Sequence, residues 1–122
     1  MSKLLNQNKK QILSQPRSFR PTMKNSFIDH IAVETKCVED SVSWYMDNFN
    51  CEIKYQDQTW AMLKFDNISV ALVTPGEHPP HFAVVNKDIS NEKNLKKHRD
   101  GIGYRYIQDP DKNFVEYIDQ RS

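Results

Sequence analysis

The sequence is short of cysteine, glycine and long apolar runs. Two cysteines in 122 residues, Cys37 and Cys51, are too few and too unpatterned for a disulfide framework. No apolar run approaches the roughly 20 residues of a membrane-spanning helix. No apolar segment near the N-terminus has the form of a signal peptide. These absences lead us to expect a reduced, cytoplasmic protein without membrane contact.

Acidic residues are absent from residues 1–27, which carry six basic ones: Lys3, Lys9, Lys10, Arg17, Arg20 and Lys24. All 16 acidic residues and the other 11 basic residues follow, so the net charge of +1 combines a basic arm with an acidic domain. Such a small net charge argues against nucleic acid as the main partner. We expect residues 1–26 to be a flexible, solvated arm. A weak targeting segment and a segment that packs on a partner subunit are the alternatives.

Hydrophobic patterning divides the rest of the chain into two halves. Residues 27–34 alternate as in a strand, and residues 38–49 repeat their apolar side chains at helical spacing. Three further strands are predicted at residues 51–55, 59–65 and 68–73. This first module, residues 27–74, therefore has the order β-α-β-β-β. A proline-rich linker, residues 75–80, follows it.

The second module, residues 81–120, repeats that order in abbreviated form. Strands are predicted at residues 81–85, 104–108 and 114–119, with a short helix around residues 91–97. The span between this helix and the next strand is too short for a full strand. We expect one α+β domain, residues 27–120, in which two such modules form a curled mixed sheet.

His30, His81 and Glu116 lie near the ends of three predicted strands. Two imidazoles and one carboxylate can form a facial triad that holds a divalent metal and leaves open positions for oxygen ligands. Taken alone, a histidine such as His30 within a strand is more often explained by a hydrogen bond to a backbone carbonyl than by metal binding. A buried Glu116 needs a partner, which a cation, Arg105 or a lysine could supply.

Several motifs resemble the vicinal oxygen chelate superfamily, which includes glyoxalases, extradiol dioxygenases and bleomycin-resistance proteins. They are DHIAV at residues 29–33, Ser41 with Trp44 and Tyr45, HFAV at residues 81–84, and DPDKNFVE at residues 109–116. The resemblance implies paired βαβββ modules that form a cup around a metal. It implies His30, His81 and Glu116 as metal ligands. The family's remaining ligand position falls at about Ala71, which cannot bind metal.

Within that family, extradiol dioxygenases have a histidine, a tyrosine, an Asp-Pro turn and the ligand glutamate in this order. His98, Tyr106, the turn at residues 109–110 and Glu116 are similar in order and spacing. The resemblance implies that His98 acts as general acid or base and that Tyr106 donates a hydrogen bond to the substrate. A solvated loop histidine and a surface tyrosine are the alternatives. The fourth histidine, His78, is predicted to be exposed in the linker.

We therefore expect a metal-dependent, dioxygenase-like enzyme whose small substrate, such as a catechol or a 2-hydroxycarbonyl compound, chelates through vicinal oxygens. Fe(II) or Mn(II) suits mixed nitrogen and oxygen ligation, with Zn(II) or Ni(II) possible. A homodimer is expected, because pairing covers open apolar strand edges. The alternatives are a glyoxalase-like isomerase or lyase, a metal-free ligand-binding module like the bleomycin-resistance proteins, and an interaction protein that uses the basic arm.

Overall fold

The computed structural model describes residues 24–122. Residues 1–23 of the predicted basic arm lie outside the described residues. The described part contains no helix that is long and apolar enough to cross a membrane.

The first module has the predicted order of elements. It consists of β1 (Ile28–Glu34), α2 (Val38–Asn48), β2 (Glu52–Gln56), β3 (Trp60–Lys64) and β4 (Ser69–Val73). Every observed boundary lies within two residues of the predicted one, because alternating and helical apolar patterns are both strong here.

The helix α2 packs on one face of these strands, which we call the outer face. Val38 and Val42 of the helix form a buried cluster with strand residues that include Leu63 and Leu72. Glu39 and Asp40 lie in the first turn of α2, where the helix dipole favours acidic side chains. This is the largest of the buried clusters, and it lies on the opposite face of the sheet from His30 and Glu116.

The second module is abbreviated, as predicted. It consists of β5 (His81–Val85), a single 3₁₀ turn η2 (Lys87–Asn91), β6 (Lys96–Lys97), β7 (Gly103–Gln108) and β8 (Phe114–Ile118).

The prediction of a helix around residues 91–97 is wrong. The 3₁₀ turn ends at Asn91, and the last two residues of this range form the strand β6. Leu95 is the one apolar residue in this range, so a helix there would have no apolar face to pack against the sheet. Asn94 has a φ of 62°, in the left-handed region that interrupts a right-handed helix.

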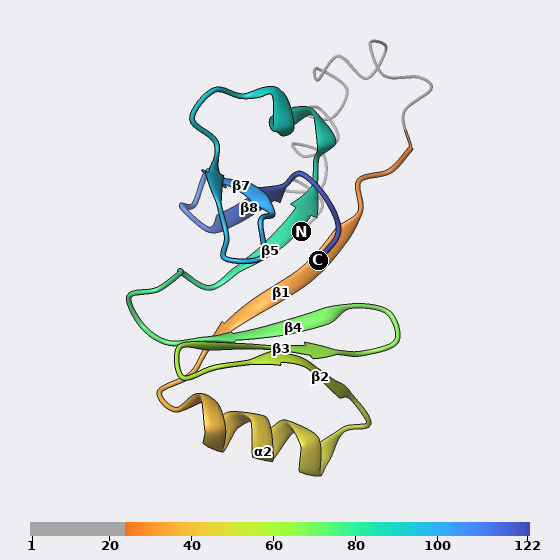
Figure 1. Cartoon of the computed structure of the whole chain (residues 1–122), viewed down its shortest axis with the longest axis vertical. Helices are drawn as coiled ribbons and strands as arrows, with labels where there is room; N and C mark the ends of the chain where they lie inside the picture. Colours follow the sequence, from red (N-terminus) through yellow and green to blue (C-terminus); the bar gives the residue numbers. More distant parts are fainter. Residues whose placement is uncertain (1–23) are drawn as a thin grey trace, which may run out of the picture.

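All eight strands form one curled mixed sheet in the order β2-β3-β4-β1-β5-β8-β7-β6 (Figure 1). In each module the first strand runs parallel to the last, as β1 does to β4 and β5 to β8. The two first strands, β1 and β5, pair antiparallel at the centre of the sheet. This arrangement confirms the predicted α+β fold of paired modules.

The register of the central strands sets a row of side chains on the inner face, the face away from α2. His30 on β1 pairs with Ala83 on β5. Ala83 also pairs with Glu116 on β8, on its other side. Glu116 in turn pairs with Tyr106 on β7. Neighbouring strands lie about 4.8 Å apart, so His30 and Glu116 start about 10 Å apart at the backbone. Ala83, fully buried, contributes only a methyl group between them. The longer side chains on either side can therefore meet above it.

Candidate metal centre

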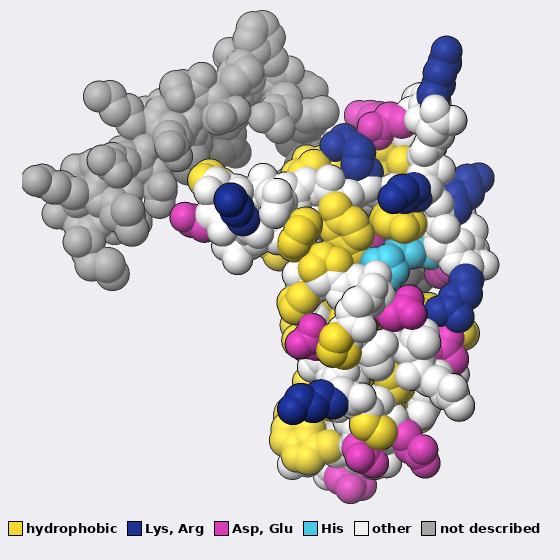
Figure 2. All heavy atoms as spheres, turned by 90° about the vertical axis from the view of Figure 1, so that its left-hand side faces the viewer, with side chains coloured by type: hydrophobic (Ala, Val, Ile, Leu, Met, Phe, Trp, Pro, Cys, Tyr) yellow, Lys and Arg dark blue, Asp and Glu magenta, His cyan; other side chains and the backbone are white. Residues whose placement is uncertain are grey.

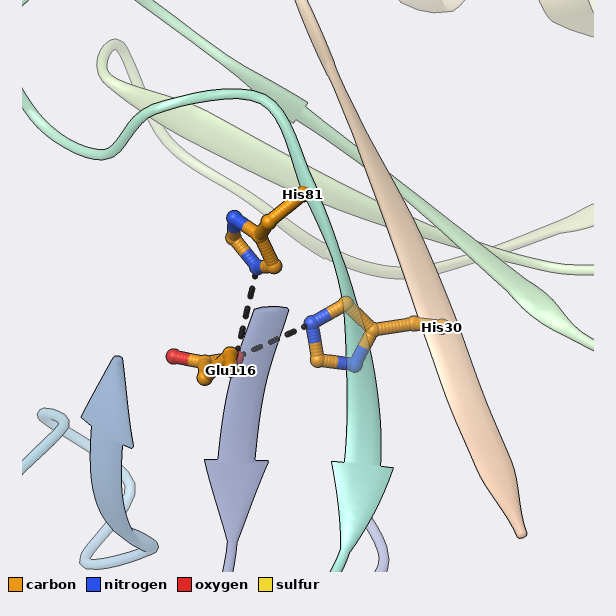
Figure 3. A group of neighbouring side chains, drawn as sticks. All are labelled: His30, His81 and Glu116. Atoms are coloured by element: carbon orange, nitrogen blue, oxygen red, sulfur yellow. Dashed lines mark ion pairs between the residues drawn. The ribbon is translucent and has the colours of Figure 1, made fainter. Parts of the chain in front are cut away.

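His30, His81 and Glu116 converge on the inner face of the sheet, as Figure 3 shows. The Nε2 atoms of His30 and His81 lie 3.4 and 3.3 Å from Oε1 of Glu116. One ligand atom from each residue lies within 4.8 Å of the others. Metal–nitrogen and metal–oxygen bonds of about 2.1 Å place adjacent ligands of an octahedral ion about 3 Å apart. The spacing of the three side chains therefore suits a facial set of ligands.

A β-bulge in β1 orients His30. The pairing of β1 with β5 shifts register between Ile28 and His30, so Asp29 is the extra residue. Consecutive strand residues normally point to opposite faces, yet Asp29 and His30 are both buried, with Asp29 Oδ2 2.7 Å from His30 Nδ1. Ser122 donates two further hydrogen bonds to Asp29, from its backbone nitrogen and its hydroxyl. A carboxylate that accepts from one ring nitrogen fixes the other as a metal ligand.

His81 is oriented by the linker that precedes it. Its Nδ1 lies 2.7 Å from the carbonyl oxygen of Pro79, and a carbonyl only accepts, so Nδ1 carries the proton. In the neutral ring, Nε2 then presents a lone pair toward the Glu116 carboxylate. Among the described residues, this Nε2 is the one buried side-chain nitrogen or oxygen without a hydrogen-bond partner. A cation between His81 and Glu116 would satisfy both groups, so the residues present fit a divalent metal.

The charges around Glu116 also suit a cation. Burial alone would raise the pKa of Glu116, but the imidazoles that face it hold that pKa well below its usual range. Burial opposes charging of His30, yet hydrogen bonds to Asp29 and Glu116 outweigh it and raise the pKa of His30 to about 9. Without a metal, a protonated His30 supplies the positive charge that the buried carboxylate needs. A divalent ion would take over that role and displace the proton.

The three residues lie in a pocket with about 670 Å³ of empty space, including the space open to solvent at its mouth. Figure 2 shows histidine side chains at the surface beside a group of hydrophobic ones. One side of the pocket is apolar, and its residues come mostly from the first module: Trp60, Met62, Ala71, Val73, Ile102 and Ile118. Ala71, at the position that the resemblance relates to a fourth ligand, adds only a methyl group to this wall.

His98 also contacts Glu116, but on its other oxygen. The loop between β6 and β7 carries His98 onto the inner face, where its Nε2 lies 2.7 Å from Oε2 of Glu116. Its ring stacks on Tyr104, with centroids 3.8 Å apart and planes at 7°. His98 is therefore a pocket residue and not a solvated loop histidine.

Tyr106 lies in the pocket with a partner that sequence reasoning missed. Its hydroxyl is 2.9 Å from Nδ1 of His78 and 3.4 Å from Nδ1 of His81. Burial and the negative charge of Glu116 raise the pKa of Tyr106, so the phenol keeps its proton. His78 was predicted to be exposed, but it is half-buried and lines the pocket. No pattern in the sequence could indicate this, because the path of the linker places His78.

No protein-family model matches the sequence, and no curated protein matches it. Solved structures do match the fold. A glyoxalase/bleomycin resistance protein/dioxygenase superfamily member from Vibrio splendidus 12B01 has a TM-score of 0.55 at 16% identity, over 77% of this chain and 98% of that one. A hypothetical protein from Bacillus halodurans C-125 has a TM-score of 0.61 at 13% identity, over 81% of this chain and 97% of that one.

The fold is also similar to that of homoprotocatechuate 2,3-dioxygenase from Brevibacterium fuscum, with a TM-score of 0.53 at 16% identity. That match covers 77% of this chain and 33% of the dioxygenase chain, so this chain spans about a third of the larger enzyme. The protein therefore has the vicinal oxygen chelate fold. On the inner face of that fold, the described residues include a candidate metal group of two histidines and one glutamate.

Proposed function

We propose that the protein is a metal-dependent enzyme that acts on a small substrate chelated through vicinal oxygens, with a dioxygenase-like site. The observation that carries this proposal is the buried convergence of His30, His81 and Glu116, with the Nε2 lone pair of His81 facing a carboxylate. Two imidazoles and one carboxylate favour Fe(II) or Mn(II), and Zn(II) or Ni(II) could also bind. The metal would act as a Lewis acid and as a template for the reactants.

The residues of the chain would bind the metal and position the substrate. His30 and His81 would hold the metal through Nε2, and Glu116 through Oε1. Ala71 offers no donor atom, so a metal held by three protein ligands would keep positions open for a chelating substrate. The apolar wall would cover the rest of the substrate and exclude water from it. The Tyr106 hydroxyl, at the edge of this site, would hydrogen-bond an oxygen of the substrate.

A glyoxalase-like isomerase or lyase is the second candidate for the same site. Such a site would use a fourth protein ligand, and the methyl group of Ala71 argues against one from β4. A metal-free ligand-binding module is the third candidate, and the unpartnered Nε2 of His81 argues against it.

We propose that the protein acts in the cytoplasm, with a small molecule as its main partner.

Metal content tests the proposed function. Untagged protein would be loaded anaerobically with Fe(II) or Mn(II), desalted and analysed for metal. About one metal ion per chain is expected for the wild type and for the control variant His78→Ala, which removes a pocket histidine outside the proposed ligand set. Little or none is expected for Glu116→Gln and His81→Phe. A wild type without metal would contradict the enzyme proposal and favour the metal-free binding module.

We also propose a homodimer that buries the outer face of β1 and β5. Ile31 and Phe82 pair directly across these strands, and each remains 38% exposed, although the corresponding face of β3 and β4 is covered by α2. Light scattering of the full chain should give twice the chain mass, and Phe82→Lys should reduce it to one chain mass. A wild-type protein that stays monomeric at high concentration would contradict the dimer.

A further inference from the structure

The position of His98 indicates a role different from acid–base catalysis. A carboxylate only accepts hydrogen bonds, so the contact of 2.7 Å means that His98 Nε2–H donates to Oε2 of Glu116. Glu116 is 1% exposed, and a hydrogen bond to an ionised group in such a place is among the stronger kinds. The Nε2 proton of His98 is thus already in use before any substrate binds.

The surroundings hold the His98 ring in this orientation. Its stacking on Tyr104 fixes the plane of the ring, and His78 packs against it edge-on with centroids 5.2 Å apart. The backbone of the loop is also fixed, because His98 donates its N–H to Ile102 and accepts from Gly101. Gly101 has a φ of 89°, which this tight loop requires and which glycine adopts without strain.

The two oxygens of Glu116 therefore face different partners. Oε1 lies 3.4 and 3.3 Å from Nε2 of His30 and His81, whereas Oε2 is bound by His98. A carboxylate can bind a metal through one oxygen or through both. A rigid donor on one oxygen fixes the orientation of the carboxylate and draws charge from that oxygen, so the other oxygen becomes the better metal ligand.

We propose that His98 is a positioning residue that restricts Glu116 to coordination through Oε1 alone. This inference rests on the metal site proposed above. Each of the three ligands then has its own orienting partner: Asp29 for His30, the Pro79 carbonyl for His81, and His98 for Glu116. One-oxygen binding by Glu116 keeps a further coordination position free, which a substrate with two adjacent oxygens needs.

Co(II) binding tests this role without any substrate. The proteins are the wild type, His98→Ala, His98→Gln and the control Asp40→Asn, which changes an exposed residue of α2. Each is checked for its fold by circular dichroism. Affinity is measured by competition with a chelator, and X-ray absorption reports the number of imidazole ligands and the mode of carboxylate binding. Wild-type protein should show two imidazoles and one carboxylate oxygen.

His98→Ala should bind Co(II) about 10-fold more weakly, as is usual when an orienting partner is removed. Its spectrum should show Glu116 bound through both oxygens. His98→Gln should restore most of the affinity and the one-oxygen mode, because the glutamine amide can donate to Oε2. Asp40→Asn should match the wild type in both measurements.

Three results would overturn the inference while leaving the metal site intact. They are wild-type behaviour of His98→Ala, failure of His98→Gln to restore the binding mode, and a third imidazole in the wild type, which would make His98 itself a ligand. A wild-type protein that binds no Co(II) would overturn the proposed function first, and this inference with it.

Discussion

The two modules share a topology but divide stability and chemistry between them. The first has an 11-residue helix, four strands of five to seven residues and the largest buried cluster. The second has a 3₁₀ turn in place of the helix and a two-residue strand, and its cluster of fully buried residues comprises Ala83, Ile102 and Ile118. Yet the second module supplies two of the three candidate ligands, His81 and Glu116, as well as His98 and Tyr106. The first module therefore contains most of the apolar core, and the second module contributes most of the polar side chains of the site.

The largest effect should come from the second module. Glu116→Gln removes the negative charge between the two histidines, so binding of Fe(II) or Mn(II) should fall below detection. The fold should persist, because most of the core lies in the first module. Isothermal titration of the metal together with circular dichroism checks both points. Retained metal binding would show that Glu116 is not a ligand.

The next effect should come from the first module. Leu63→Ala removes a fully buried side chain under α2 and should lower the free energy of unfolding by about 3 kcal/mol. Ile107→Ala is the comparison change on β7 of the second module. It should cost about 1 kcal/mol, because Ile107 is only partly buried. Urea unfolding of both variants checks the difference. Equal costs would contradict the proposed division of stability between the modules.

A smaller effect is expected where the first module supports the site. Asp29→Asn keeps the size of the side chain but removes the charge that orients and polarises His30. Metal affinity should fall about 10-fold. The control Asp40→Asn makes the same change on the exposed side of α2 and should leave affinity unchanged. If Asp29→Asn bound metal as tightly as the control, the bulge in β1 would have no role in the site.

The smallest effect concerns the turn between β2 and β3. Asp57 accepts hydrogen bonds from the backbone of Thr59 and Trp60 and pairs with Arg99 of the second module. Burial acts against the ionised form, but the hydrogen bonds from Tyr55, Trp60 and Thr59 outweigh it and hold the pKa of Asp57 well below its ordinary range. Because the pKa of Asp57 is lower in the folded state than in the unfolded state, ionised Asp57 stabilises the fold at pH values above its unfolded-state pKa. This stabilisation is lost as the pH falls from the unfolded-state pKa toward the folded-state pKa. Asp57→Asn should therefore cost about 1 kcal/mol at pH 7.

Urea unfolding at several pH values checks this last prediction. The difference between Asp57→Asn and the wild type should shrink steadily below about pH 4. A difference that is constant with pH would mean that the Asp57 charge contributes nothing and that the variant acts through the shape of the turn alone.

The sequence predicted the first module almost completely, because its apolar residues recur at the spacing of the structure that each segment forms. It also predicted His30, His81 and Glu116 as one group of ligands, through the resemblance and through their positions on strands. The pairing of β1, β5 and β8 brings them together in space. No local pattern encodes that pairing, so the sequence alone could only suggest it.

Other features of the site depend on contacts between distant segments. The bulge at Asp29, the hydrogen bond from His98 to Glu116 and the path that carries His78 to Tyr106 all arise from the assembled sheet. The predicted helix at residues 91–97 was wrong for a related reason. Residues 91–97 are mostly charged and polar, so a helix there would have almost no apolar face to bury. In the structure, Asn94 has a positive φ, which interrupts any helix in this segment.

Titration with Mn(II), followed by electron paramagnetic resonance, tests the central claim most directly. Mn(II) free in solution gives a strong six-line signal that is reduced on binding to protein. We expect wild-type protein to remove the signal of about one Mn(II) per chain, and Glu116→Gln to leave it almost unchanged. An equal signal from the two proteins at every Mn(II) concentration would contradict a metal centre at His30, His81 and Glu116.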